Sequence, residues 1–232
     1  MDNSHLLTLK NLTVWYTKNK PVLKELSMKL GTNEIVGLIG LNGAGKTTLI
    51  KTLSGLLDSF RVEDTLWQEK PFMFRDRDFK KNRYVVFAEE HSFSFFTFRE
   101  YASYVAASYG KELSDVDELV QGFQFEEYTD VLLKELSTGN QKKAYLIAAF
   151  ALKPQLLVLD EPVNGLDFQS TEYLYSRING YRQYGTVLFS SHFLESICLT
   201  SDRVLVLEEG RIRKRFTGQE IETDKIREVL KE

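Results

Sequence analysis

The sequence is poor in cysteine and proline, and it contains no long apolar run. Cys198 is the single cysteine, which excludes an internal disulfide and favours a reducing compartment; the residue itself is expected to be a small part of the core. The opening MDNSHLLTLKN lacks the cationic and apolar segments of a secretory signal peptide. The longest apolar stretch, residues 144–152, is about half of the roughly 18 residues that a membrane span requires. The sequence therefore predicts a protein that does not itself cross a membrane.

Neither sign of charge dominates the chain. With 30 basic and 33 acidic residues, the net charge is -3, so no overall field attracts nucleic acid, and no nucleic-acid partner is expected. Hydrophobic residues make up 43% of the 232 residues, which is enough for a full core. The length predicts one α/β domain with sub-regions, or two small domains.

The most informative segment is GLNGAGKTT at residues 40–48, between an apolar run at 34–39 and an amphipathic stretch that begins at Leu49. Its glycines let successive backbone amides face one anion, and the following helix adds partial positive charge. Lys46 would supply a charge for the β and γ phosphates, and Thr47 a hydroxyl for Mg²⁺. A plain glycine turn is the alternative, but it does not require the full spacing G-x-x-x-x-G-K-T. The residues expected to bind the nucleotide here are Asn42, Gly43, Gly45, Lys46, Thr47 and Thr48.

A second segment places two carboxylates after an apolar run. Residues 156–159 are typical of a buried parallel strand, and Asp160-Glu161-Pro162 follows, at the end of the strand where ligands of open α/β sheets bind. We expect Asp160 to hold Mg²⁺ through water and Glu161 to act as general base. The alternative is a helix cap followed by proline in the first turn.

Periodicity gives a coarse order of elements. Short β-like runs at 6–9, 13–16 and 26–30 predict an antiparallel meander, and sheet strands are predicted at 35–39, 156–159, 186–189 and 204–207. Helical spacing occurs at 46–56, 97–109, 113–120 and 142–152, and Ser54-Gly55 is expected to close the first of these helices.

Three further motifs follow the phosphate loop in a fixed order around LLVLDEP: LSTGN at 136–140, NGLD at 164–167 and SSH at 190–192. Together, the five motifs resemble the ATP-binding cassette (ABC) ATPase family along nearly the whole chain. The resemblance implies an α/β fold: a P-loop NTPase core with a mainly parallel sheet, an antiparallel β-subdomain and a helical subdomain. It implies one domain, 1–232, with antiparallel β regions at 1–33 and 58–82, the core at 34–57 and 154–210, helices at 91–153 and a C-terminal tail at 211–232.

In that family two cassettes form a head-to-tail dimer around two ATP molecules. The resemblance implies that Ser137 and Gly139 touch the γ-phosphate held by the other subunit, and that Asp167 lies in the loop that joins the two sites. It also implies that His192 reaches the γ-phosphate and holds the attacking water near Glu161.

An aromatic residue of the family stacks on adenine, and Tyr16 matches it, with Trp15 as the alternative. The chain departs from the family at Glu89, where relatives carry a glutamine that meets Mg²⁺. A carboxylate can ligate Mg²⁺, but the pair Glu89-Glu90 is alternatively a solvated surface pair. Thr138 and Asn140 also replace the usual glycine and glutamine.

The resemblance implies an ATP-binding and ATP-hydrolysing subunit that uses ATP and Mg²⁺ and drives a separate transmembrane permease. It implies a cytoplasmic location, peripheral on the inner face of the membrane through that partner. GLNGAGKTT, NGLD and the short chain resemble the cassettes of bacterial exporters, which favours export of a peptide, antibiotic or lipid. The alternatives are a soluble cassette ATPase that acts on nucleic acid or ribosomes and a weakly active ATP-binding scaffold.

An aromatic cluster stands out in the helical region. Either it is local core, or part of it receives a short helix from the membrane subunit. Its members are Phe93, Phe95, Phe96, Phe98, Tyr101, Tyr104 and Tyr109.

Overall fold

The computed structural model describes residues 5–89 and 92–231 and contains two β-sheets. The larger is six-stranded, and all neighbouring strands in it run parallel except the last pair. Its strands, in spatial order, are β7 (Arg83–Val86), β8 (Leu156–Leu159), β9 (Thr186–Ser190), β3 (Ile35–Ile39), β10 (Arg203–Glu208) and β11 (Arg211–Thr217). The α/β fold class is confirmed.

The second sheet is antiparallel and has the order β2-β1-β5-β6, with β4 paired to β1. Its strands are β1 (His5–Thr17), β2 (Lys20–Gly31), β4 (Phe60–Arg61), β5 (Asp64–Trp67) and β6 (Lys70–Pro71). The sequence predicts two short strands where β1 is continuous. The polar break between them is a bulge and not a turn, because Asn11 adopts φ 54° and its N–H bonds the Ser27 hydroxyl of the neighbouring strand.

Eight α-helices are assigned in the described parts of the chain. They are α1 (Lys46–Leu53), α2 (Arg77–Asn82), α3 (Phe98–Tyr109), α4 (Val116–Gly122), α5 (Thr138–Leu152), α6 (Phe168–Gly180), α7 (Leu194–Thr200) and α8 (Thr223–Lys231). Helix α1 ends three residues before the expected position 56, because Ser54 caps it and Gly55 turns the chain at φ 74°. Helix α4 also starts three residues later than expected, after Asp115 at φ 59°.

Two of the expected regions need correction. The predicted antiparallel β region at 58–82 contains helix α2, whose Phe79 is buried against Trp67 and Phe72. The predicted C-terminal tail at 211–232 is not a tail. Its first part is β11, paired with β10, and its second part is α8, whose apolar side chains Ile226 and Val229 are buried.

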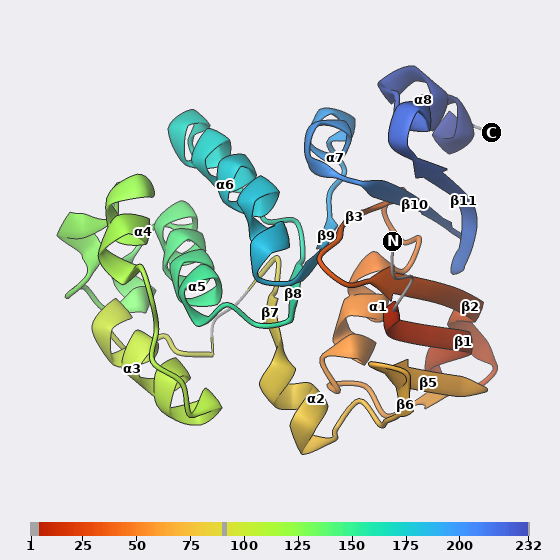
Figure 1. Ribbon diagram of the computed structural model, residues 1–232, viewed down its shortest axis with the longest axis horizontal. Helices are drawn as coiled ribbons and strands as arrows, with labels where there is room; N and C mark the ends of the chain where they lie inside the picture. The colour runs from red at the N-terminus through yellow and green to blue at the C-terminus, as the bar shows by residue number, and fades with distance from the viewer. Residues whose placement is uncertain (1–4, 90–91, 232) are drawn as a thin grey trace.

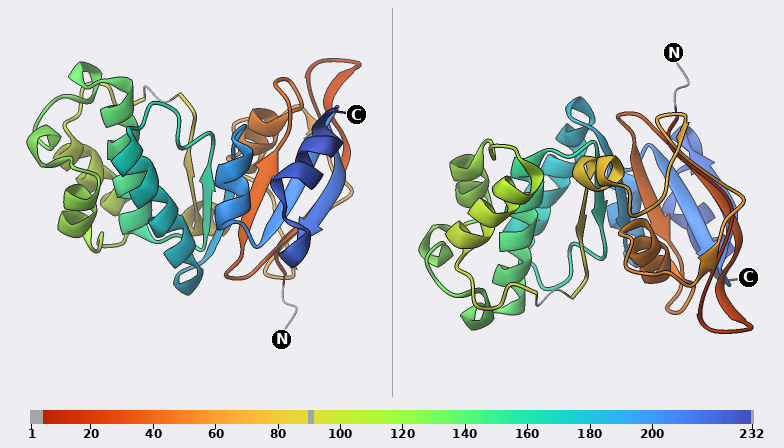
Figure 2. Two further views of the ribbon diagram at one scale, coloured as in Figure 1. Left: turned by 90° about the horizontal axis from the view of Figure 1, so that it is seen from above. Right: turned by 90° about the horizontal axis from the view of Figure 1, so that it is seen from below.

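The elements form an elongated molecule with the antiparallel sheet at one end and the helices α3, α4 and α5 at the other (Figures 1 and 2). Helix α1 packs into an apolar cluster that both sheets share, through Leu49, Ile50 and Leu53. Within residues 5–89 and 92–231, no helix is long and apolar enough to cross a bilayer.

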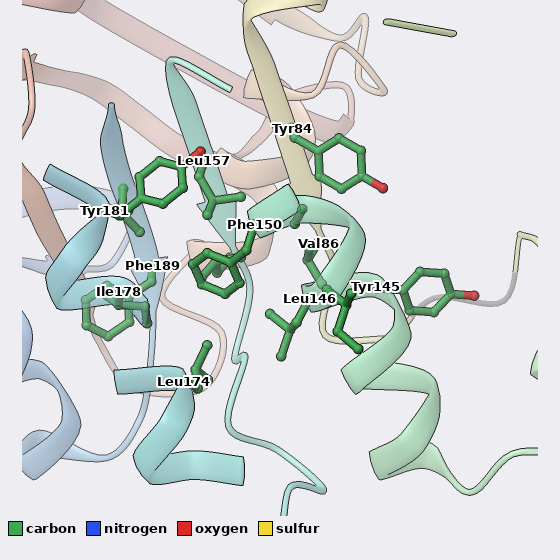
Figure 3. Close-up of a cluster of buried hydrophobic side chains, with 14 of the residues drawn as sticks. Tyr84, Val86, Tyr145, Leu146, Phe150, Leu157, Leu174, Ile178, Tyr181 and Phe189 are labelled. Carbon is green, nitrogen blue, oxygen red and sulfur yellow. The ribbon is translucent and has the colours of Figure 1, made fainter. Parts of the chain in front are cut away.

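Helix α5 lies at the centre of the second apolar cluster. In Figure 3 its Phe150 lies near Leu157 of β8 and its Leu146 lies near Val86 of β7. Leu174 and Ile178 of α6 belong to the same cluster. Residues 142–152 of α5 are buried on every face, as expected for a helix enclosed by other elements. The N-terminal end of this enclosed helix is therefore well placed to hold neighbouring loops in position.

Candidate nucleotide-binding site

Four neighbouring parallel strands end at one edge of the large sheet, and each is followed by a predicted site residue. The phosphate loop follows β3, the Asp160-Glu161 pair follows β8, His192 follows β9 and Glu89 follows β7. Ligands of open α/β sheets bind at this edge. The topology thus explains why residues far apart in sequence meet.

The phosphate loop passes directly into α1. Gly45 precedes the helix at φ 110°, a conformation that favours glycine, and an added Cβ would lie 2.7 Å from a Leu23 methyl group. The Lys46 Nζ is buried, donates to the Gly40 carbonyl at 2.7 Å and lies 3.8 Å from Glu161 Oε1. Loop amides, helix N-terminus and ammonium together suit a polyphosphate.

Asp160 is fully buried and is held at both carboxylate oxygens. Its Oδ2 accepts a hydrogen bond from the Thr47 hydroxyl at 3.0 Å, and its Oδ1 accepts one from the Ser190 hydroxyl at 2.6 Å. The hydroxyl and carboxylate oxygens expected to serve Mg²⁺ are therefore adjacent.

Glu161 is the neighbouring carboxylate and has a different environment. Its backbone adopts φ 47°, in the left-handed region that non-glycine residues seldom enter. Its Oε2 lies 2.7 Å from His192 Nδ1. The two residues predicted to be catalytic are thus in direct contact, next to Lys46.

The phosphate loop opens into a cavity of about 620 Å³. Another cavity, of about 420 Å³, lies away from the phosphate loop, beside α2, β7 and α3. The residues that line the larger cavity are Val22, Leu41, Asn42, Gly43, Gly45, Lys46, Thr47, Thr48, Glu161, Asn164 and His192. A second hollow of about 600 Å³ has Thr47, Asp160 and Glu89 in its wall. Glu89 therefore lies on the same side as the two other residues expected to serve Mg²⁺, while its neighbour Glu90 lies outside the described residues.

Tyr16 is better placed for a nucleotide base than Trp15. The Tyr16 side chain is 56% exposed, and its hydroxyl lies 3.4 Å from the Thr48 hydroxyl of the phosphate loop. Trp15 is half-buried, and its backbone N–H bonds the Ser59 carbonyl.

The two predicted residues of the LSTGN segment do not line the 620 Å³ cavity. Ser137 caps α5, where its hydroxyl accepts from the Asn140 N–H at 3.3 Å, and it is exposed. Gly139 packs so closely on the NGLD loop that an added Cβ would lie 2.2 Å from the Gly165 carbonyl oxygen. Their contact with a nucleotide held by another subunit stays a prediction.

Asp167 also lies outside that cavity, and its carboxylate is engaged within the chain. It caps α6 by accepting from the Ser170 N–H at 2.8 Å, and it pairs with the buried Lys143 ammonium at 2.8 Å. The hydrogen bond from Lys143, with those from Ser170, holds the pKa of the Asp167 carboxyl well below its usual range.

Sequence reasoning missed two residues that hold this site together. Ser190 bonds both Asp160 and the Glu161 backbone, and a polar residue directly after the apolar residues 187–189 was the available signal. Lys142 of α5 is buried and donates to the carbonyls of Phe87 and Ala88 at 2.6 and 2.7 Å, just before Glu89. No sequence pattern indicates that contact, because it joins segments more than fifty residues apart.

The phosphate loop, the paired carboxylates and the parallel sheet define a P-loop nucleoside triphosphatase. Similarity to known proteins identifies the family of triphosphatases to which the chain belongs. The sequence model of the ABC transporter family matches residues 23–164, and the chain belongs to that family. It is an ATP-binding subunit of an ABC transporter and an ATPase whose hydrolysis is coupled to transport.

Similar proteins cover nearly the whole chain. AlbC of Bacillus subtilis (strain 168) is 34% identical over 97% of both chains, and the ABC-type transporter ATP-binding protein EcsA of the same strain is 34% identical over 93% of this chain and 89% of its own. The solved structure of an ATP-binding subunit of an ABC transporter has a TM-score of 0.82 at 27% identity and covers 91% of this chain and 90% of its own.

Proposed function

We propose that this ATPase subunit hydrolyses Mg²⁺-ATP with Glu161 as general base and, as one of two cassettes in a head-to-tail dimer, drives a separate membrane permease. The observation that carries the chemistry is the contact of Glu161 with His192 at 2.7 Å beside the phosphate-loop Lys46. A carboxylate so placed can take the proton of an attacking water, and the imidazole holds the carboxylate toward the cavity. The Lys46 ammonium, now shared by the Gly40 carbonyl and Glu161, is free to move to phosphate oxygens.

The residues present fit Mg²⁺. The Thr47 hydroxyl and the Asp160 carboxylate meet at 3.0 Å, and Glu89 lines the same hollow. Mg²⁺ is commonly held by one or two carboxylates with waters and substrate phosphates, so this limited donor set is sufficient. The bound ion would neutralise charge on the phosphates.

The proposed permease contact rests on a groove of about 420 Å³ between α2, β7 and α3, which we call the aromatic groove. Its aromatic wall is formed by Tyr84, Phe87, Phe93, Tyr101, Tyr104 and Tyr109. Phe98 is buried core and Phe95 is exposed outside the groove, so the aromatic cluster divides between the two expected roles. Phe87 and Leu56 also line the hollow of Glu89, which makes the groove continuous with the nucleotide site.

Charge indicates what the groove would accept. Lys80, Lys81 and Arg83 line it, and both lysines are exposed. Among the residues that the structure describes, none of those lining the groove is acidic. A short helix with an apolar face and an acidic side chain complements these features.

The test first isolates the membrane protein that co-purifies with the subunit from its host. It then measures the binding of the two proteins to each other and the rate of ATP hydrolysis. We expect the permease to stimulate hydrolysis and Lys80→Glu/Lys81→Glu to weaken the complex while leaving hydrolysis by the free subunit unchanged. Lys29→Glu/Lys70→Glu, which makes the same charge change on exposed positions of the antiparallel sheet, is the matched control. Equal binding of both double variants would reject the groove as the contact.

We further propose that transport runs outward, as the sequence motifs favour, with a peptide, antibiotic or lipid as cargo. Similar proteins include a zinc import and a phosphate import ATP-binding protein, of Hydrogenovibrio crunogenus and Aeropyrum pernix, at 32% and 30% identity. Direction therefore needs its own measurement in inverted membrane vesicles, where ATP-dependent accumulation supports export and its confinement to right-side-out vesicles contradicts it.

A further inference from the structure

A single buried hydroxyl joins the two carboxylate residues of the site. Ser190 ends strand β9 and is 0% exposed. Its hydroxyl donates to Asp160 Oδ1 at 2.6 Å and accepts from the Glu161 backbone N–H at 3.0 Å. A serine hydroxyl has one hydrogen, and here it is committed to Asp160.

The first bond fixes how Asp160 presents its oxygens. Because Oδ1 is held by Ser190, Oδ2 is the oxygen that faces Thr47, at 3.0 Å from its hydroxyl. Without the Ser190 hydroxyl, the carboxylate could rotate and exchange its two oxygens. Loss of the Ser190 hydroxyl would also leave one oxygen of the fully buried Asp160 carboxylate without its hydrogen-bond partner.

The second bond acts on Glu161. This residue stands at φ 47°, where an L side chain is strained, so its backbone must be held by its surroundings. The Ser190 hydroxyl is the acceptor of its N–H, and from this backbone the Glu161 side chain reaches His192 Nδ1. Ser190 thus determines the position of the base without itself facing the 620 Å³ cavity.

We propose that Ser190 is a positioning residue for hydrolysis: it sets which oxygen Asp160 offers to Mg²⁺ and holds the strained backbone of Glu161. The inference rests on the proposed roles of Asp160 and Glu161. It predicts two separable losses on removal of the hydroxyl, one in Mg²⁺-dependent nucleotide binding and one in turnover.

The neighbouring serine supplies a matched control. Ser191 is 1% exposed, and its hydroxyl accepts from the Phe193 N–H at 3.0 Å, so it is equally buried but bonds neither carboxylate residue. Ser191→Ala removes the same atom from the adjacent position. Ser190→Thr retains the hydroxyl and tests rescue.

The experiment compares the parent, Ser190→Ala, Ser190→Thr and Ser191→Ala by titration with a fluorescent ATP analogue, with and without Mg²⁺, and by steady-state hydrolysis. For Ser190→Ala we expect the Mg²⁺-dependent gain in affinity to fall about tenfold, as for loss of one hydrogen bond to a charged group, and binding without Mg²⁺ to stay unchanged. We expect kcat to fall more than KM rises. Ser190→Thr should recover most of both losses.

Each outcome bears on one hypothesis. If Ser190→Ala and Ser191→Ala change thermal stability alike and leave the Mg²⁺ dependence intact, Ser190 has only a structural role and the inference is wrong. If the parent itself shows no Mg²⁺-dependent gain in affinity, the proposed metal site fails instead. Failure of Ser190→Thr to recover function, with a normal melting temperature, would contradict the role given to the hydroxyl.

Discussion

At the scale of single residues, the site contains more negative than positive charge. Asp160, Glu161 and Glu89 lie around the two neighbouring cavities. Lys46, in the phosphate loop, and Lys51, in α1, also belong to the lining of these cavities. The Lys46 Nζ lies 3.8 Å from Glu161, so the cation that should meet phosphate is shared with the base. A triphosphate adds further negative charge, which makes the position of Glu89 the most informative one to neutralise.

Replacing Glu89 with glutamine should favour ATP binding. The amide removes a like charge beside Thr47 and Asp160 while it retains one oxygen ligand, so we expect the Mg²⁺-ATP affinity to rise by a few-fold up to about tenfold. Isothermal titration over a range of Mg²⁺ concentrations measures it. Glu127→Gln on the exposed 3-10 turn Glu126–Tyr128 is the control, and an equal effect there would mean that Glu89 is a solvated surface residue.

The motif residues of the phosphate loop, Asp160, Glu161 and His192 could be predicted because their spacing in sequence encodes local geometry. The Ser190 bridge could not be predicted, since Ser190 ends β9 while its two partners, Asp160 and Glu161, directly follow β8. Only the parallel pairing of those two strands brings the hydroxyl within bonding distance.

At the scale of elements, α5 connects three loops. Its N-terminal end carries the capping residue Ser137 and Gly139. Lys142 donates to the carbonyls before Glu89, and Lys143 pairs with Asp167 at the start of α6. Two consecutive buried lysines on one helix point to different loops, because neighbours on a helix are about 100° apart. A shift of α5 would therefore move the loop of Glu89 and the loop of Asp167 together.

The Lys143–Asp167 pair predicts a pH-dependent stability. The pKa of Asp167 is lowered in the folded state, so its contribution is fully present above the unfolded-state pKa near ~3.9 and is lost as pH falls below it. Asp167→Asn should lower the free energy of unfolding by about 1 kcal/mol at pH 7, since half of the side chain is solvated and asparagine still caps the helix.

Urea unfolding at pH 7 and at about pH 3, below the unfolded-state pKa, measures this difference, which should shrink at the lower pH. Asp130→Asn, which breaks the exposed pair with Arg99, should change stability little at either pH. A difference for Asp167→Asn that grows on acidification would contradict the assignment.

Element boundaries were predictable where a capping signal marks them, as at Ser54-Gly55. Helix α2 and the C-terminal elements were not, because their apolar residues are few and their burial depends on partners distant in sequence. Phe79 packs on Trp67 of the antiparallel sheet, and α8 packs on α7 and β10.

At the scale of the whole molecule, the nucleotide site lies at the sheet edge, and the LSTGN segment lies outside its cavity. Ser137 is exposed, so a nucleotide held by a second copy has access to it. The aromatic groove shares Phe87 and Leu56 with the hollow of Glu89, so a permease helix in the proposed position would lie next to the nucleotide site. The proposed dimer and the proposed permease contact thus involve different residues of one chain.

If Glu161 is the general base, the site should bind ATP without it but should not hydrolyse ATP. The most direct measurement is steady-state ATP hydrolysis by Glu161→Gln beside its ATP affinity. We predict an affinity close to the parent value and turnover reduced at least about 100-fold, because the amide retains the shape of the side chain and cannot accept the proton. Hydrolysis at the parental rate, with ATP binding intact, would contradict the account.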